Sequence, residues 1–122
     1  MTPHTVAEHL AHLRHAGALD GADHVGEASG DQRLLVRVGL WLDGAGRVAR
    51  ARYRATTCAA LIAYAEAACA LAEERGGGAL GPERLRRLVR GVHPVHRDRA
   101  DLVALALARA LASSPGRTQE LA

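Results

Sequence analysis

The fold is decided by the stretch QRLLVRVGLWL-DGAG-RVARARYRA, residues 32–55 of the chain. In Gln32–Leu42 apolar side chains alternate with polar ones, as they do in a strand that buries one face. Asp43–Gly46 has the glycine-rich composition of a tight turn, and Arg47–Ala55 alternates again. The apolar faces of the two segments carry Leu34, Val36, Val38, Leu40 and Leu42, and Ala49, Ala51 and Tyr53. We therefore predict an antiparallel hairpin.

Helical patterns flank this hairpin. Pro3–His15 follows a Thr-Pro cap and repeats apolar residues at three- and four-residue spacing, and a Gly- and Asp-rich connection over residues 17–30 leads to the first strand. Cys58–Arg75 is an alanine-rich helix, which Thr56 or Thr57 can cap. Its apolar stripe is predicted to hold Leu61, Ile62, Ala65, Cys69 and Ala72. The glycine run at residues 76–78 is interpreted as the loop that ends this helix.

Two further helices are predicted towards the C-terminus. Gly81-Pro82-Glu83 opens a short basic helix that runs through Arg90, and Asp98–Ala112 has the spacing of an amphipathic helix. The apolar residues in that spacing are Leu102, Leu105 and Leu111. The sequence thus predicts one α+β domain over residues 1–122, with 113–122 as a frayed tail. Its core is a small antiparallel sheet, the hairpin with a possible third short strand, packed by about four helices.

Composition excludes some classes of protein. The chain has 122 residues, 48% of them apolar, which suits one compact core. It contains no long uncharged apolar run, so we expect a soluble cytoplasmic protein without a membrane partner. The net charge is +3 and the pI is about 9.5, but all sixteen basic residues are arginines and no nucleic-acid-binding pattern is present. We do not expect nucleic acid as a partner.

One group of arginines is predicted to lie on the outer face of the hairpin, opposite the apolar side chains. Its members are Arg33, Arg37, Arg50, Arg52 and Arg54. This group is a candidate surface for an acidic partner protein. The alternative is a solvated sheet face that guanidinium groups keep soluble.

The histidines of the first helix and one of the two cysteines are interpreted as structural. His9, His12 and His15 recur every three residues and therefore fan out around a helix, which does not favour a shared metal ion. Cys69 lies mid-helix among alanines, where a thiol behaves as a small buried hydrophobe. Eleven positions on one helix separate it too far from Cys58 for a disulfide, so we expect two reduced thiols.

Cys58 differs because it lies where the second strand becomes a helix. Its sulfur is expected near helical N–H groups and the positive end of the helix dipole, an environment that favours a thiolate. Ser29-Gly30-Asp31 directly precedes the first long strand, and His96-Arg97 directly precedes the last helix. We expect these three boundaries to converge at one end of the domain. No arrangement of nucleophile, base and orienting group is found elsewhere, so no enzymatic turnover is predicted.

With these residues the sequence resembles the NifU/IscU family of iron–sulfur cluster assembly scaffolds. The family's first-helix pattern, acid-His-aromatic-x-Asn-Pro-Arg-Asn-x-Gly, is followed without a gap by Glu8–Gly17, in which His9, Arg14 and Gly17 match. The family's Cys-Gly-Asp, Gly-Cys and His-Cys correspond here to Ser29-Gly30-Asp31, Thr57-Cys58 and His96-Arg97. The resemblance spans about residues 6–111 and implies the family's fold. A shortened connection after the first helix leaves open whether the family's first short strand is kept.

The resemblance implies a ligand site that is incomplete in this chain. The family's site uses three cysteines with an Asp and a His, and here Asp31, Cys58 and His96 remain. Ser29 is a poor ligand for soft iron–sulfur chemistry, and Arg97 brings a permanent cation to a cysteine position. A cluster of the family's type is therefore not expected. The remaining set could hold Zn²⁺ or Fe²⁺, or Arg97 could pair with Asp31 and close the site without metal.

Two functions follow from the resemblance. The first is a divergent, scaffold-like protein of iron–sulfur cluster assembly, which binds iron, zinc or a transient sulfur species through Asp31, Cys58 and His96 and meets a cysteine desulfurase. The second is a non-catalytic interaction protein that keeps the fold around a salt-bridged, metal-free site and modulates the desulfurase or another partner. The sequence does not predict the oligomeric state.

Overall fold

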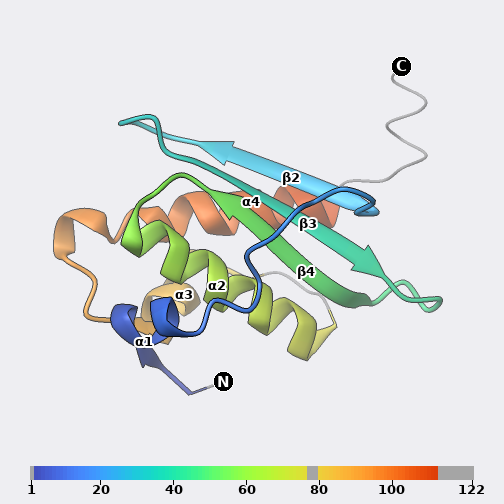
Figure 1. The fold of residues 1–122 in the computed structure, drawn as a ribbon, viewed down its shortest axis with the longest axis horizontal. Coiled ribbons are helices and arrows are strands. Elements are labelled where there is room, and N and C mark those ends of the chain that lie inside the picture. Colours follow the sequence, from blue (N-terminus) through green and yellow to red (C-terminus); the bar gives the residue numbers. More distant parts are fainter. Residues whose placement is uncertain (1, 77–79, 113–122) are drawn as a thin grey trace.

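The structure, a computed structural model, describes residues 2–76 and 80–112. It is an α+β domain with a three-stranded antiparallel sheet and helices on one face, which confirms the predicted fold class (Figure 1). Gly77, Gly78 and the predicted frayed tail at 113–122 lie outside the described residues. In chain order the elements are β1 His4–Thr5, α1 Val6–Ala11, β2 His24–Ser29, β3 Leu35–Leu42, β4 Val48–Ala55, α2 Ala59–Arg75, α3 Pro82–Leu88, β5 Val89–Arg90, the 3-10 helix η1 Pro94–His96, and α4 Arg99–Ala112.

The sheet has the order β2-β3-β4, so the third strand that the sequence left open is β2. The predicted hairpin is present as β3 and β4. Its register shifts between Trp41 and Leu42, where Trp41 pairs with Arg50 but Leu42 pairs with Val48. This bulge inserts Ala49 as an extra residue. The prediction that Ala49 shares the apolar face is therefore wrong: Ala49 is exposed and Val48 is buried.

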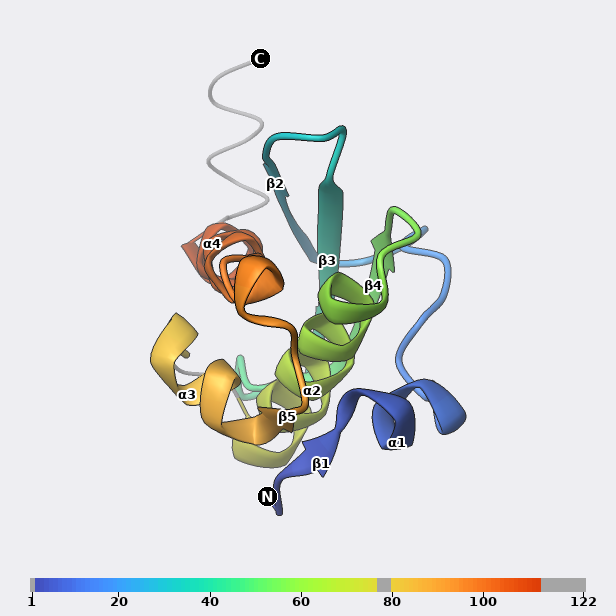
Figure 2. The ribbon, with the colours of Figure 1, turned by 90° about the vertical axis from the view of Figure 1, so that its left-hand side faces the viewer.

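The helices form two layers below the sheet. α2 packs against β4 and α4 against β2, and α1 and α3 lie on the far side of these two helices (Figure 2). Because α2 has neighbours on most sides, almost every residue from Ala60 to Ala72 is buried, and the predicted single apolar stripe was too narrow. None of the helices in residues 2–76 and 80–112 is long and apolar enough to cross a membrane.

α4 approaches the sheet closely because β2 carries a glycine at the contact. A Cβ atom at Gly26 would overlap the backbone of Ala106 and Ala110. The face of α4 turned to the core is correspondingly small: Ala100, Val103, Ala106, Leu107 and Ala110. The predicted stripe had the wrong helical phase, since Leu105 is 41% exposed.

The first helix is shorter than predicted. Its N-cap is Thr5, whose hydroxyl accepts from the N–H of Glu8 while the Glu8 carboxylate accepts from the N–H of Thr5, a capping box. The prediction of a helix over Pro3–His15 missed this signal. His4–Thr5 pairs in parallel with Val89–Arg90. Because Val89 and Arg90 form this strand, α3 ends at Leu88, two residues before the predicted end at Arg90.

The segment after α1 lies along the free edge of β4. The N–H of Tyr53 donates to the carbonyl of His15 (2.9 Å), and the N–H of Gly17 donates to the carbonyl of Tyr53 (3.1 Å). The neighbouring outward N–H, that of Ala51, donates to the Glu73 carboxylate (2.8 Å). The middle of this edge strand is therefore covered by other parts of the same chain.

Candidate functional site

Three segments meet at the end of the domain where β4 turns into α2, the end that Figure 2 faces. They are the turn after β2, the junction at Cys58, and the segment that leads into α4. The group that joins them is the guanidinium of Arg99, which donates to the side-chain oxygen of Gln32 (3.1 Å) and interacts with the Cys58 thiol. The segments meet through Gln32, Cys58 and Arg99 rather than through the predicted Asp31, Cys58 and His96, and sequence reasoning missed Arg99.

Arg99 is buried, with 7% of its surface exposed, although it is the first residue of α4. Its Nη1 atom donates to the Asp98 carboxylate (2.7 Å) and to the carbonyl of Val95 (3.5 Å), and Nη2 donates to Gln32. Hydrogen bonding to Asp98, and to a smaller extent to Cys58, raises the pKa of Arg99. The Nε atom is buried and has no hydrogen-bond partner. Hydrogen bonds thus hold the Nη1 and Nη2 atoms of this guanidinium in place, whereas its Nε–H group has no acceptor.

Cys58 is half-buried and is the N-cap residue of α2. Its side chain makes no capping hydrogen bond, and neither predicted cap, Thr56 or Thr57, holds that position. Thr56 instead extends the hairpin, where its hydroxyl accepts from the N–H of Leu35 (3.1 Å). Cys69, in contrast, is fully buried, and burial raises the pKa of its thiol. The two thiols therefore differ in their access to a reagent.

A groove of about 400 Å³ opens beside Arg99. Its polar lining residues are Asp31, Gln32, Asp98, Arg99 and Asp101. Asp31 is exposed on this groove, and Ser29 is the exposed last residue of β2. The groove carries three carboxylates and one guanidinium, so it presents an acidic rim around a buried cation.

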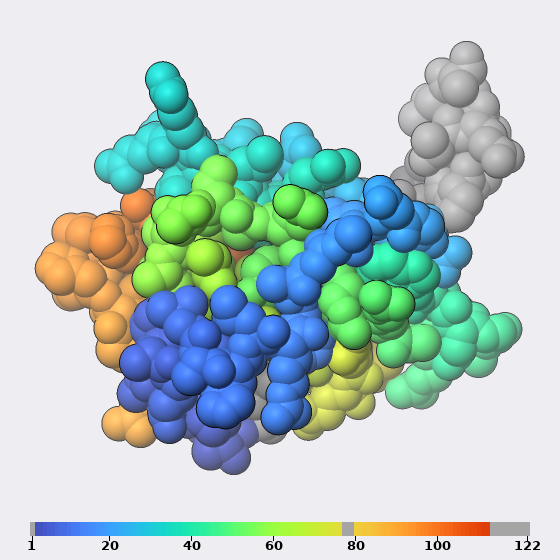
Figure 3. All heavy atoms as spheres, viewed as in Figure 1, coloured from blue at the N-terminus to red at the C-terminus, as the bar shows by residue number. Residues whose placement is uncertain are grey.

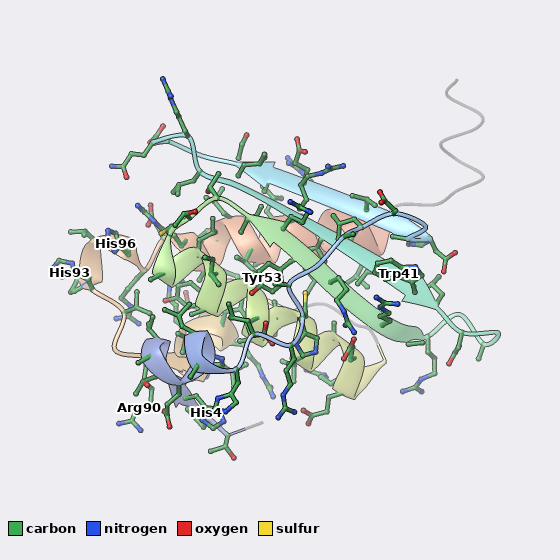
Figure 4. The ribbon with its side chains drawn as sticks, in the orientation of Figure 1. His4, Trp41, Tyr53, Arg90, His93 and His96 are labelled. Carbon is green, nitrogen blue, oxygen red and sulfur yellow. The ribbon has the colours of Figure 1, made fainter. Side chains whose placement is uncertain are left out.

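His96 and Arg97 are neither among the residues that hydrogen-bond the Arg99 side chain nor among those that line its groove. His96 is on η1, where its ring is 5.8 Å from that of His93, and both rings lie at the outer end of the domain (Figure 4). The Arg97 side chain lies near the buried hydroxyl of Tyr64, whose pKa is raised by burial and lowered in part by this guanidinium. Among the described residues no ion pair joins Arg97 to Asp31. The ion pair at the meeting point is formed by Arg99 and Asp98.

The donor atoms at this end do not fit a metal centre in the observed arrangement. Within residues 2–76 and 80–112, no three His, Cys, Asp or Glu side chains are grouped so that they could hold a metal ion. A guanidinium lies where the three segments meet, and a fixed cation disfavours a second cation beside it. A ligand role for Asp31, Cys58 and His96 remains a prediction.

The arginines of the hairpin have different surroundings. Arg37 pairs with Glu27 (3.3 Å), and Arg50 lies over the ring of Trp41 (4.8 Å to its centroid). Arg52 turns round the sheet edge to the Glu73 carboxylate (2.8 Å) and is half-buried. Arg54 is exposed on β4, whereas Arg33 is exposed in the turn before β3, so its predicted place on the strand is wrong. A partner surface here remains a prediction, with Arg52 already engaged inside the protein.

A second polar cluster, which sequence reasoning missed, lies under the N-terminal segment that crosses the front of the molecule in Figure 3. Glu66, in the middle of α2, accepts from the N–H groups of Arg14 (3.2 Å) and His15 (3.1 Å), from the His15 ring, and from the Tyr53 hydroxyl (3.3 Å). The other ring nitrogen of His15 bonds Glu73 (2.9 Å). The signal in the sequence that could have revealed this cluster was Glu66, a glutamate among alanines in the predicted helix.

The charges of this cluster are mutually stabilised. The hydrogen bond to Glu66 raises the pKa of His15 against the opposing effect of burial. Burial acts to raise the pKa of Glu66, but hydrogen bonds from His15 and the backbone outweigh it and lower that pKa. His9 lies apart from this pair, with its Nε2 near the carbonyl of Leu88 (3.4 Å). The cluster therefore holds an imidazolium between carboxylates and is structural.

Comparison with known proteins points to the family that the sequence resembles. No family model matches the chain. The chain is 47% identical over 75 residues to the bifunctional protein NifU/MnmA of Rubrobacter xylanophilus, a match that covers 57% of this chain. The same match covers only 14% of that relative, so the chain corresponds to a small part of it. The similarity supports a NifU-like relationship.

Proposed function

We propose that this NifU-like chain takes part in iron–sulfur cluster assembly by carrying sulfur on Cys58, without a metal ion. The observation that supports this most is the half-buried Cys58 thiol beside the Arg99 guanidinium, at the meeting point of three segments. The similarity to NifU supports the pathway at the level of the family. The protein is not proposed to turn over a substrate, and a cytoplasmic location remains a prediction.

The proposed step is a sulfur transfer between thiols. The thiolate of Cys58 attacks the terminal sulfur of a persulfide on a donor protein; the sulfur–sulfur bond of the donor breaks, and the donor leaves as a thiolate. Cys58 is left as a persulfide, with no net oxidation. A cysteine desulfurase, the partner implied by the resemblance, is the proposed donor.

Sulfur fits the site better than metal. Thiolates and imidazoles bind Zn²⁺ and Fe²⁺ when they converge, but here a permanently charged guanidinium occupies the convergence. A negatively charged sulfur on Cys58 would instead find a cation beside it. The Zn²⁺ or Fe²⁺ alternative would require Arg99 to leave its partners Asp98 and Gln32.

The decisive experiment is sulfur transfer measured by intact mass. The protein is incubated with a cysteine desulfurase and cysteine, and the addition of one sulfur atom is followed. We expect the wild type and Cys69→Ser, the matched control with the buried thiol replaced, to acquire sulfur, and Cys58→Ser to acquire none. Sulfur on Cys58→Ser, or none on the wild type, would refute the proposal.

Elemental analysis of anaerobically purified protein tests the metal alternative. We expect zinc and iron well below one ion per chain in the wild type and no change in Cys58→Ala. Near-stoichiometric metal that disappears in Cys58→Ala would restore the metal-binding interpretation and overturn the metal-free proposal.

A non-catalytic interaction protein is the second candidate, and the Arg99–Asp98 ion pair at the centre of the site favours it (2.7 Å). In that case the site is closed, and the protein acts only by binding a partner protein with its surface. Binding to a desulfurase would then be unchanged by Cys58→Ala, and no sulfur would be transferred to the wild type.

A further inference from the structure

Arg99 is the most unusual polar side chain at the site because only some of its buried N–H groups have a hydrogen-bond partner. Buried polar groups in proteins are nearly always hydrogen-bonded, since an unmatched donor loses its bonds to water without replacement. Two nitrogens of Arg99 have partners, but Nε is buried without one. The only other buried side-chain nitrogen or oxygen atom without a partner in the described part of the chain is the Tyr64 hydroxyl, which lies near Arg97.

We infer that Arg99 is a built-in counter-ion for a negatively charged sulfur carried on Cys58, so that a guanidinium performs here the charge-balancing role of a metal ion. This inference rests on the proposed sulfur-carrying function and names the residue that makes it work. The ligand class is a terminal sulfur anion bonded covalently to Cys58, and Arg99 is the residue that positions and stabilises it.

The hydrogen bonds of Arg99 leave donors for this purpose: of its five N–H groups, Nη1 donates to Asp98 and Val95 and Nη2 donates to Gln32, while Nε, which is buried, has no partner. The Asp98 carboxylate holds Nη1 and the Gln32 side chain holds Nη2, from the two sides of the groove. Because a guanidinium is planar and its donors diverge in fixed directions, fixing two nitrogens also fixes the direction of the third. A lysine carries its three donors on one nitrogen and lacks the separate, fixed directions in which the guanidinium holds Asp98 and Gln32.

The charges around the groove distinguish a covalently carried anion from a free one. Asp31, Asp98 and Asp101 line the groove, and Asp98 and Asp101 pair with Arg99 and Arg86, so one carboxylate charge is left over and disfavours a dissolved anion. A sulfur bonded to Cys58 is held beside Arg99 by its own bond and does not have to pass this barrier by itself. The site is therefore suited to retain a sulfur anion that a partner delivers, and unsuited to collect anions from solution.

Burial strengthens the interaction. Arg99 is 7% exposed, so its attraction to a neighbouring negative charge is screened less by water than it would be on the surface. Cys58 also caps α2, a helix of 17 residues, whose first N–H groups add positive potential at the same place. The two effects act on the same sulfur.

The test uses inorganic polysulfide as the sulfur donor, so that no partner protein is needed. Wild type, Arg99→Met and Arg99→Lys are loaded, freed of excess reagent, exposed to a small-molecule thiol that takes the outer sulfur and leaves Cys58 as a thiolate, and followed by intact mass. We expect loss of sulfur from Cys58 to be about tenfold faster in Arg99→Met, with only partial recovery in Arg99→Lys. Arg84→Met, which removes an exposed arginine, is the matched control and should behave as wild type.

A second readout detects the cation without any persulfide. Cys58 is alkylated with iodoacetate, which is negatively charged, and with neutral iodoacetamide. The ratio of the two rates should fall in Arg99→Met and stay constant in Arg84→Met. Thermal unfolding of each variant separates these effects from a loss of structure, and Gln32→Ala, which releases only Nη2, provides a milder variant in case Arg99→Met unfolds.

The outcomes separate the two proposals. If polysulfide or a desulfurase places no sulfur on Cys58 of the wild type, the proposed function fails and the inference fails with it. If the wild type carries sulfur but Arg99→Met retains it equally well and keeps the same ratio of alkylation rates, Arg99 is not the counter-ion and only the inference is overturned.

Discussion

Glu66 and Arg99 are both charged and almost fully buried, with 4% and 7% of their surface exposed, yet their surroundings differ. The oxygens of Glu66 accept from the backbone of Arg14 and His15, from the His15 ring and from Tyr53. Arg99 holds exposed partners with two nitrogens and leaves Nε without one. A buried charge with every bond satisfied fixes the fold, whereas one with a free donor is available to a ligand.

The largest expected effect is the loss of Glu66. Glu66→Ala should lower the free energy of unfolding by about 3–5 kcal/mol, because it removes one of the two carboxylates that hold the His15 imidazolium and leaves two backbone N–H groups without their acceptor. Urea denaturation at neutral pH measures this loss. Glu83→Ala, which removes a carboxylate that is 76% exposed, should change stability by about 0.5 kcal/mol or less. If the two variants lost the same unfolding free energy, the buried cluster would contribute no more to stability than an exposed carboxylate.

A smaller effect should appear in the pH dependence of stability. The folded pKa of His15 is raised above 6.5 and that of Glu66 is lowered below 4.5. The contribution of protonated His15 is therefore complete below pH 6.5 and is lost as pH rises through its folded pKa. The contribution of ionised Glu66 is complete above pH 4.5 and is lost as pH falls through its folded pKa. The cluster should stabilise the fold most between these limits.

The difference between wild type and His15→Gln isolates this effect. Burial lowers the pKa of His9, so His9 acts in the opposite direction and favours the fold as pH rises. Subtracting the two pH profiles of unfolding free energy cancels the contribution of His9. A difference that stays constant through and above pH 6.5 would show that His15 is not held as an imidazolium.

The smallest expected effect on stability is the loss of Arg99. Arg99→Met should change the free energy of unfolding by about 1 kcal/mol or less, because an apolar side chain of similar volume removes a buried charge together with its unsatisfied donor. Its partner Asp98 is 68% exposed and returns to water. Urea denaturation beside Glu66→Ala tests this. A loss as large as that of Glu66→Ala would make Arg99 a structural residue and would contradict the comparison.

The hairpin and the boundary at Cys58 could be read from sequence because both depend on local patterns. Alternation in residues 32–55 predicted β3 and β4 but missed the bulge at Ala49, since an inserted residue leaves no mark on composition. It also began the first strand too early, because Gln32 and Arg33 have positive φ and β3 begins at Leu35. Cys58 was recognised from its place between a strand and a helix. The NifU-like relationship, supported by the relative from Rubrobacter xylanophilus, rested on the order of such boundaries.

Arg99 was missed because the phase of the last helix was assigned from its leucines. Leu102 and Leu105 suggested the buried face, but the core side is lined by smaller residues such as Val103 and Ala106. Stepping back from Val103 by four residues reaches Arg99, so the correct phase predicts a buried arginine. That phase depends on Gly26 of β2, which lets alanines approach the sheet, and this contact is invisible in the sequence of the helix.

The polar cluster was missed for a related reason. Its hydrogen bonds join Glu66 to Arg14 and His15, about fifty positions earlier in the chain, and no local pattern encodes such a distance. The sequence predicted only that His15 would not share a metal ion with His9 and His12. Pairing with a carboxylate across the fold required the structure.

The covering of β4 by the segment around His15 has a consequence for association between copies. An edge strand offers a row of unpaired backbone groups on which a second chain can add a strand, a common start of aggregation. Here the outward N–H and C=O of Tyr53 are taken by His15 and Gly17, and the outward N–H of Ala51 by Glu73. The contacts that hold the N-terminal segment in place thus also keep this edge from templating self-assembly.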